Sequence, residues 1–394
     1  MQFGPIRRRR GLQLAVAASV LVLATGCASG LAGGDSDDDG GDGPIKLGML
    51  APFSGSESAF GAYMQNGAQL AVDEINADGG VLGRDLELVV EDDACDATTA
   101  VAGANKLVTD GVVASVGGYC SGATLPTLPI FDDAGVPMVI PAANSNELVE
   151  QELPGVFLIN GTGDQQAAAA VQYADGLGAD TIAVIDDATS YSADLAGAFA
   201  EQATEAGLTI AFEATITPGE NDYSAVATQL ATTQPKLVYW TGYYQEGGLI
   251  ARQATDAGFS GTFLVADGSV DAKFAEIAGA AYTDNVVGTF TQTPDMIEGA
   301  DEWIAAYEDL AGDPPGPYST QSYDAVRVMA QAIEDAGSTD FDEVVAALEG
   351  LTDFETFAGP LTFTEKHTLS GGGFVIVSID PATGNFVLED DLQA

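Results

Sequence analysis

Short apolar segments alternate with amphipathic segments from about residue 45 almost to the end of the chain, and this pattern constrains the fold most. Ile45–Leu50 has the length and composition of a buried strand. Ala59–Asn76 then places apolar residues at helical spacing and ends before a glycine pair. Because short apolar strands separated by amphipathic helices form parallel sheets covered on both faces, we predict an α/β fold. Further strands are expected at 86–90, 112–116, 136–140, 181–185, 209–213, 237–240, 262–265 and 285–290, with helices between them, including 98–109 and 123–133.

The alternation comes in two runs that break near Gly161–Asp164, and 394 residues suffice for two domains. We therefore predict two similar lobes. The C-terminal part differs, because three helices precede a few short strands. These helices are expected at 294–310, 319–335 and 340–350, and the strands near Leu361, 374–377 and 386–388.

The N-terminus has the layout of an export signal, residues 1–26. Arg7–Arg10 supply the positive region, and Leu12–Thr25 is an uncharged apolar stretch too short for a comfortable membrane span. The stretch ends in Leu23-Ala24-Thr25-Gly26-Cys27, which resembles a bacterial lipobox, so Cys27 is expected to carry lipid. A plain secretory signal and twin-arginine export are the alternatives.

Residues 28–44 are rich in Gly and Asp and almost free of apolar residues, which predicts a flexible, self-repelling tether behind Cys27. Asp35, Asp37 and Asp39 imitate the start of a calcium loop. The position that needs a bidentate Glu holds Lys46, so the match fails.

The charge balance excludes several partners. The chain has 59 acidic and 12 basic residues and a net charge of −47. Such a surface repels nucleic acid and anionic membranes, so the only membrane contact expected is the lipid anchor. The acidity indicates either general solubility or adaptation to high salt, where screening suppresses self-repulsion.

The residues favour binding over catalysis. The single histidine, His367, lies in a polar stretch that we interpret as an exposed turn, and no nucleophile elbow is present. Clusters of His or Cys for zinc are absent from the sequence, as are a Walker loop and a dinucleotide-binding glycine motif after a strand. Carboxylate-only catalysis stays open, because acids are so numerous. No cofactor is expected.

Several stretches resemble the leucine/isoleucine/valine-binding proteins, which are type I periplasmic binding proteins of ABC importers. The resemblance runs from about residue 45 to 388 and rests on the order and spacing of its motifs. These are Ile75–Gly80, Glu91–Asp96, Ala104–Val108, Gly118–Ser121, Ile140–Ala143, Tyr239–Tyr243 and Gly359–Phe363.

The resemblance implies two doubly wound, Rossmann-like lobes joined by three crossover segments. Lobe 1 would comprise 45–163 and 291–372, and lobe 2 would comprise 164–290 and 373–394. In an exported chain Cys95 and Cys120 favour a disulfide over two free thiols, and the family's disulfide between equivalent cysteines supports this pairing.

The resemblance also implies an amino-acid site between the lobes. On lobe 1, the family's matching serine, here Ser121, binds the ligand carboxylate, although a helix cap is its other interpretation. Asn144 stands where the family has Thr, and an amide can still donate and accept. The lobe 1 candidates are Phe60, Tyr119, Cys120, Ser121, Ala142, Ala143, Asn144 and Tyr318.

On lobe 2, Asp267 aligns with the glutamate that binds the ligand ammonium, and it is one methylene shorter. Tyr243 aligns with a tyrosine that meets the same ammonium, and Tyr191 with one that lines the cleft. Phe60 and Tyr318 replace a tyrosine and a phenylalanine of the family, which leaves the side-chain specificity open.

The first hypothesis is therefore a monomeric lipoprotein, exported and anchored at the outer face of the cell membrane. It would deliver a branched-chain or related small amino acid to a permease and its ATPase. The same fold could instead bind urea, short amides or aromatic or organic acids, or serve as a sensory receptor without a transporter. An enzyme is the remaining alternative.

Overall fold

A computed structural model describes residues 43–297, 299–371, 373–390 and 392. The predicted export signal, Cys27 and nearly all of the tether lie outside this range. Within it, no helix combines the length and the apolar character needed to cross a membrane.

The first sheet has five parallel strands in the order β2-β1-β3-β4-β5. Its central strands are short and buried, as a sheet covered on both faces requires. The strand β5 was not predicted from the sequence, because the four apolar residues between Gly155 and Asn160 carry no clear pattern. The strands are β1 (Ile45–Ala51), β2 (Leu86–Asp92), β3 (Ala114–Ser115), β4 (Met138–Ile140) and β5 (Val156–Leu158).

The helices of this half are mostly as expected, and α2 begins at an N-cap, where the Asp96 carboxylate accepts a bond from the Thr99 amide at 2.8 Å. The expected helix at 123–133 is broken into three pieces, because Pro126 and Pro129 remove backbone donors. The elements are α1 (Ser58–Ala77), α2 (Ala97–Thr109), α3 (Ser121–Thr124), η1 (Leu125–Thr127), α4 (Leu128–Asp133) and α5 (Glu147–Glu150).

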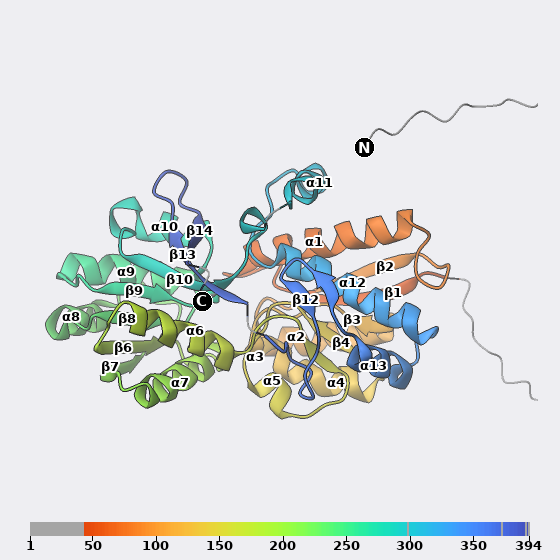
Figure 1. Cartoon of the computed structure of the whole chain (residues 1–394), viewed down its shortest axis with the longest axis horizontal. Coiled ribbons are helices and arrows are strands. Elements are labelled where there is room, and N and C mark those ends of the chain that lie inside the picture. Colours follow the sequence, from red (N-terminus) through yellow and green to blue (C-terminus); the bar gives the residue numbers. More distant parts are fainter. Residues whose placement is uncertain (1–42, 298, 372, 391, 393–394) are drawn as a thin grey trace, which may run out of the picture. The chain divides into compact units, whose positions relative to one another are not determined.

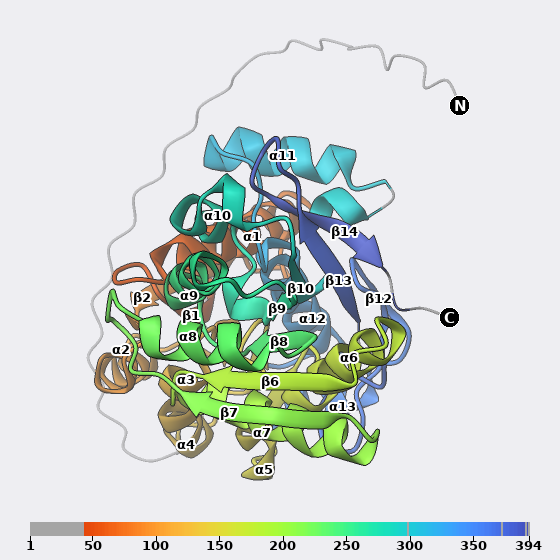
Figure 2. The ribbon, with the colours of Figure 1, turned by 90° about the vertical axis from the view of Figure 1, so that its left-hand side faces the viewer.

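The second sheet has seven strands in the order β14-β13-β10-β9-β8-β6-β7. The strands β6 to β10 are parallel, as predicted, and Figure 2 shows β6 and β7 side by side. The two C-terminal strands are antiparallel, which the strand–helix alternation did not indicate. The strands are β6 (Thr181–Asp186), β7 (Thr209–Thr215), β8 (Leu237–Trp240), β9 (Thr262–Val265), β10 (Val286–Thr291), β13 (Phe374–Ile379) and β14 (Phe386–Asp390).

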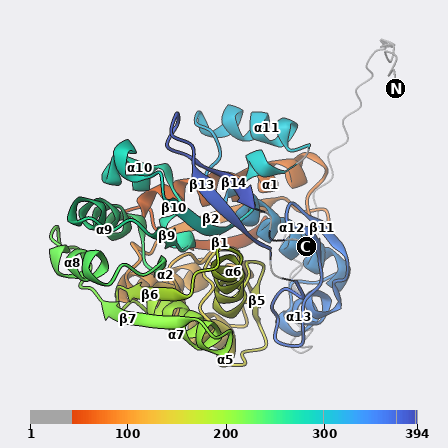
Figure 3. The ribbon, with the colours of Figure 1, turned by 60° about the vertical axis from the view of Figure 1, so that its left-hand side comes forward.

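Helices surround the parallel part of this second sheet. The first of them, α6, starts with a capping box between Thr162 and Gln165 and packs against α7 (Figure 3). The elements are α6 (Gly163–Gly176), α7 (Ser190–Glu205), α8 (Ser224–Thr233), α9 (Tyr244–Ala257), η2 (Asp267–Ser269), α10 (Ala272–Ala278) and η3 (Ala280–Tyr282).

The chain passes between the two sheets three times, after β5, after β10 and after β12. The middle passage brings α12 against α1 of the first half, and α13 packs on α12 (Figure 1). We call the five-stranded sheet with its helices lobe 1 and the seven-stranded sheet with its helices lobe 2. The remaining elements are η4 (Pro294–Met296), α11 (Asp301–Ala311), α12 (Ser319–Ala336), α13 (Phe341–Gly350), β11 (Phe354–Thr356) and β12 (Gly359–Leu361).

The prediction of a single helix at 294–310 is wrong. A short 3₁₀ turn, η4, is followed by Gly299 at φ 89°, and α11 begins only at Asp301. A positive φ ends a right-handed helical path, so the two segments cannot join.

The carboxyl ends of the parallel strands carry the loops that form the site. In sheets of this kind, ligands bind just outside those ends. On lobe 1 the loops follow β1, β3 and β4, and on lobe 2 they follow β6, β8 and β9. Gly117, after β3, lies so close to β1 that an added Cβ would stand 2.4 Å from the Leu50 nitrogen, which requires glycine there.

Candidate functional site

The carboxylate of Asp267 is the centre of the site. It follows β9, opens η2 and is 3% exposed. Its oxygens accept hydrogen bonds from the hydroxyls of Tyr191 and Tyr318 and from the Asn144 amide nitrogen, the last at 3.3 Å. Burial raises the pKa of Asp267, and the two tyrosine hydroxyls oppose that rise.

The groups around Asp267 come from both lobes. Tyr191 lies in the first turn of α7, on the same lobe as Asp267, whereas Asn144 follows β4 and Tyr318 precedes α12, both on lobe 1. The Asn144 amide nitrogen also lies 2.9 Å from Oε1 of Gln166 on α6. The acid therefore joins the lobes through two direct hydrogen bonds.

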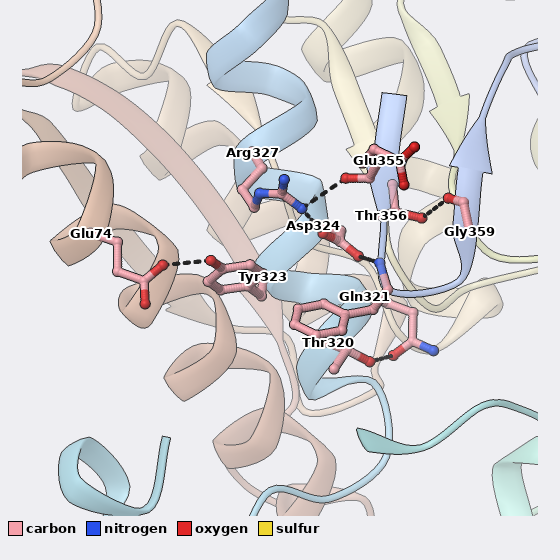
Figure 4. A network of polar contacts seen from close by, with 10 residues as sticks. Glu74, Thr320, Gln321, Tyr323, Asp324, Arg327, Glu355, Thr356 and Gly359 are labelled. Atoms are coloured by element: carbon pink, nitrogen blue, oxygen red, sulfur yellow. Dashed lines mark hydrogen bonds and ion pairs between the residues drawn. The ribbon is translucent and has the colours of Figure 1, made fainter. Parts of the chain in front are cut away.

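Polar contacts connect α12, the helix that Tyr318 precedes, to its neighbours, and Figure 4 shows these contacts around Tyr323, Asp324 and Arg327. The Tyr323 hydroxyl donates to Glu74 of α1, and Arg327 pairs with Asp324 at 2.6 Å. The second Asp324 oxygen accepts the Phe357 amide at 2.8 Å, which ties the helix to the β11–β12 hairpin. These contacts hold α12 in place against two neighbouring elements.

Tyr318 has a strained backbone, with φ 63° immediately before α12. Non-glycine residues rarely adopt this left-handed region, and such residues cluster at functional sites. In this conformation the Tyr318 hydroxyl donates a hydrogen bond to the Asp267 carboxylate, so the strained backbone accompanies a contact between the lobes.

A small cavity of about 10 Å³ adjoins Asp267. This volume is comparable with that of one water molecule, so an amino acid can enter only if the lobes or the side chains move apart. Gly268 must stay small here, because an added Cβ would stand 3.0 Å from the Tyr243 ring and 3.2 Å from the Tyr191 ring. The lining residues are Tyr119, Ala142, Asn144, Tyr191, Tyr243, Asp267, Gly268 and Tyr318.

Aromatic rings form one wall of the cavity. Tyr119 of lobe 1 and Tyr243 of lobe 2 face each other with ring centroids 6.3 Å apart, and Tyr191 lies 5.4 Å from Tyr243. Phe60 stacks on Tyr119 at 4.5 Å from behind. The expected wall residue Phe60 thus supports the wall rather than lining the cavity.

Three other expected residues do not line the cavity. Ala143 packs in a lobe 1 core cluster, and Cys120 forms a disulfide with Cys95 with a Cα–Cα distance of 5.4 Å. The Ser121 hydroxyl, 1% exposed, accepts the amide of Ser145 at 3.2 Å and links two loops of the site.

Two residues of the site were not predicted from the sequence. Gly268 directly follows Asp267 after a strand, a position that could have been recognised. Gln166 lies inside α6, where it bonds Asn144 and, at 2.9 Å, the Thr289 hydroxyl. Nothing in the helical pattern distinguishes it.

His367 differs from its predicted environment. It does lie in a turn, at φ 58°, but its side chain is only 14% exposed. Its ring stacks on Phe157 at 4.0 Å, and Nδ1 lies 3.2 Å from the Val156 carbonyl oxygen. The described residues contain no group of His, Cys, Asp or Glu arranged to hold a metal ion.

Two α/β lobes, three connecting passages and an acid shared across the lobes define a type I periplasmic binding protein fold. The family model described as periplasmic binding protein matches residues 44–384, and the chain belongs to this family.

The relatives include a Leu/Ile/Val-binding protein of Rhizobium johnstonii, 36% identical over 334 residues, or 84% of this chain and 90% of the relative. A leucine-, isoleucine-, valine-, threonine- and alanine-binding protein of Pseudomonas aeruginosa is 34% identical over 333 residues, or 84% and 89%. Among solved structures, the substrate-binding protein of a branched-chain amino acid transporter of Streptococcus pneumoniae, complexed with isoleucine, is similar. It has a TM-score of 0.79 and 28% identity over 88% of this chain and 100% of that one.

Proposed function

We propose that this chain is the substrate-binding component of an ABC importer and captures an α-amino acid between its lobes. The observation that carries the proposal is the buried Asp267 carboxylate, which groups from both lobes contact. A carboxylate accepts about four hydrogen bonds, so a ligand ammonium would join or replace the contacts that Tyr191, Tyr318 and Asn144 make with Asp267. The names of the relatives favour a branched-chain or related small amino acid.

The ligand carboxylate would lie on lobe 1. The Ser121 hydroxyl accepts the Ser145 amide, and its own hydrogen remains available for donation to an anion. Ala142 and Asn144 line the cavity beside it and offer further polar groups. Since the ammonium partner lies on lobe 2, a bound amino acid would contact both lobes and favour the closed arrangement.

Calorimetry with a panel of amino acids tests this function. We expect binding of at least one α-amino acid, and we expect Asp267→Ala to weaken it at least about a hundredfold, because the ammonium loses its charged partner. Asp335→Asn is the matched control, since Asp335 is exposed on α12 and bonded only to Gln331.

Two results would contradict the proposal. Binding of no α-amino acid would exclude the assignment. Undiminished binding by Asp267→Ala would indicate a ligand without an ammonium, such as urea, a short amide or an organic acid.

The proposal includes the setting in which the protein works. Family membership supports an extracytoplasmic location, and the Cys95–Cys120 disulfide suits an oxidising compartment. We propose lipid attachment at Cys27, a monomer, and delivery to a permease, with lobes 45–163 plus 291–372 and 164–290 plus 373–394 as the moving bodies. Release of a Cys27→Ser variant from the membrane fraction would support the anchor, and retention would argue against it.

A further inference from the structure

Two further acidic side chains are buried near the cavity without complete hydrogen bonding. Glu57 is 4% exposed, and its Oε2 has no hydrogen-bond partner; Asp187 is 1% exposed, and its Oδ2 has none. The hydroxyl of Tyr119, which lines the cavity, is also buried and without a partner. A buried polar atom left unpaired is costly, so the clustering of three such atoms calls for an explanation.

These groups come from both lobes. Glu57 lies on lobe 1, just before α1, and Asp187 lies on lobe 2, after β6. The Glu57 carbonyl accepts the amide of Phe60 at 3.1 Å, and the Phe60 ring stacks on Tyr119. Asp187 Oδ2 borders Gly242, the residue before Tyr243. Glu57 therefore lies close to Tyr119, and Asp187 close to Tyr243.

In the part of the chain that the structure describes, no ion pair neutralises these acids. Within the described ranges, the ion pairs involve only Lys106, Arg327 and His367, none of them with Glu57 or Asp187. Three acids of lobe 2, Glu246, Asp271 and Asp187, act on Glu57 and raise its pKa further. Burial and these neighbours raise the pKa of Glu57 to about 8. Isolated buried carboxylates are unfavourable, and a cation between them removes the penalty.

We propose that Glu57 and Asp187 bind a cationic group at the side-chain end of the ligand, so that the protein prefers a basic α-amino acid. This inference rests on the proposed function and replaces the branched-chain side chain by a charged one. The ammonium of the ligand would pair with Asp267, and its side-chain cation would lie between Glu57 and Asp187. The faces of Tyr119 and Tyr243 would add cation–π attraction.

The charge balance supports this assignment. A neutral amino acid brings one positive and one negative group, which leaves Glu57 Oε2 and Asp187 Oδ2 without a hydrogen-bond donor when the lobes close. A basic amino acid brings one further positive charge together with N–H donors for the unpaired oxygens of Glu57, Asp187 and Tyr119. Because the two acids belong to different lobes, the side-chain cation would also bridge the lobes, as the ammonium does at Asp267.

The test compares ligands of matched shape by calorimetry on the full mature chain. Arginine and citrulline have nearly the same shape, but only arginine is cationic; lysine, ornithine and leucine complete the panel. We expect arginine, lysine or ornithine to bind at least about tenfold tighter than leucine, and arginine to bind at least about tenfold tighter than citrulline. This comparison uses the unaltered protein and does not depend on any variant folding.

The variant Glu57→Gln identifies the residue responsible. It keeps the shape and removes the charge, so it should weaken binding of the basic ligand about tenfold or more and leave leucine binding unchanged or improved. Glu205→Gln, an exposed position at the end of α7, is the control and should alter neither.

The outcomes separate this inference from the proposed function. If leucine binds as tightly as the basic amino acids, or if Glu57→Gln weakens both classes equally, the inference is wrong while the proposed function stands. If no α-amino acid binds, both are wrong.

Discussion

Tyr318 shows how one residue links strain, hydrogen bonding and closure. It alone contributes a hydroxyl from lobe 1 to Asp267, whereas Tyr191 contributes one from the lobe that carries the acid. A hydrogen bond to a charged group contributes about 1.5–3 kcal/mol. We therefore expect Tyr318→Phe to weaken ligand binding by roughly tenfold to a hundredfold, measured by calorimetry, because closure loses an inter-lobe bond.

The control for this prediction is Tyr307→Phe, which removes a hydroxyl that donates to the Tyr63 carbonyl at 3.2 Å within lobe 1. It should change stability slightly and affinity little. Equal affinity for Tyr318→Phe and the unaltered protein would show that the bond to Asp267 does not contribute to closure.

Individual site residues differ in how far the sequence alone can predict them. Asp267 and Asn144 were candidates because the resemblance to the leucine/isoleucine/valine-binding proteins aligns them with ligand-binding residues. Both lie in loops that follow strands, where the sheet geometry gathers side chains. Gln166 and Glu57 were not found, since one lies within a helix and the other in a polar loop. Their roles depend on which side chains the two lobes bring together, and the local sequence pattern does not predict contacts between distant segments.

The helix α12 is the element whose position matters most for the site, because Tyr318 stands at its start. The Asp324 side chain is 3% exposed. It forms an ion pair with Arg327 and accepts a hydrogen bond from the Phe357 amide. Replacing Asp324 by Asn removes the charge from both contacts, and we expect a loss of about 1–3 kcal/mol in the free energy of unfolding. Denaturant titration measures this loss, and the exposed Asp335→Asn on the same helix should cost under about 0.5 kcal/mol.

A loss for Asp324→Asn no larger than that of the Asp335→Asn control would mean that the polar network does not hold α12.

Long helices such as α12 and α1 were predicted almost to the residue, because their apolar periodicity extends over several turns. The errors fall on short elements. The strand β5 has three residues, and the break before α11 depends on one glycine conformation. Such features carry too few residues for a periodic pattern.

At the scale of the whole molecule, acidity has two separate consequences. Most of the 59 acids add to a surface repulsion that salt can screen, with a Debye length of about 3 Å at 1 M. A smaller set is buried, including Glu57, Asp93 and Asp324. Salt does not reach these groups, so their effect on folding must be sought in the pH dependence instead.

The pH dependence of stability should therefore run opposite to ordinary acid denaturation between about pH 5 and pH 8. Burial raises the pKa of Glu57 from 4.5 to about 8, and that of Asp93 and Asp324 from 3.8 to about 6. The folded chain thus holds protons that the unfolded chain releases. The stabilisation is complete below the ordinary values and is lost as pH rises through about 6 and then about 8. Each such carboxyl contributes at most ~1.4 kcal/mol per pH unit within its window.

Denaturant unfolding at about 1 M NaCl, where surface repulsion is screened, isolates this effect. We expect the free energy of unfolding to fall from about pH 5 to about pH 8, and Glu57→Gln to flatten the upper part of that fall, because the amide does not titrate. The exposed control Glu205→Gln should leave the slope unchanged. A free energy of unfolding that rises with pH over this range would show that these carboxyls are ionised in the folded protein.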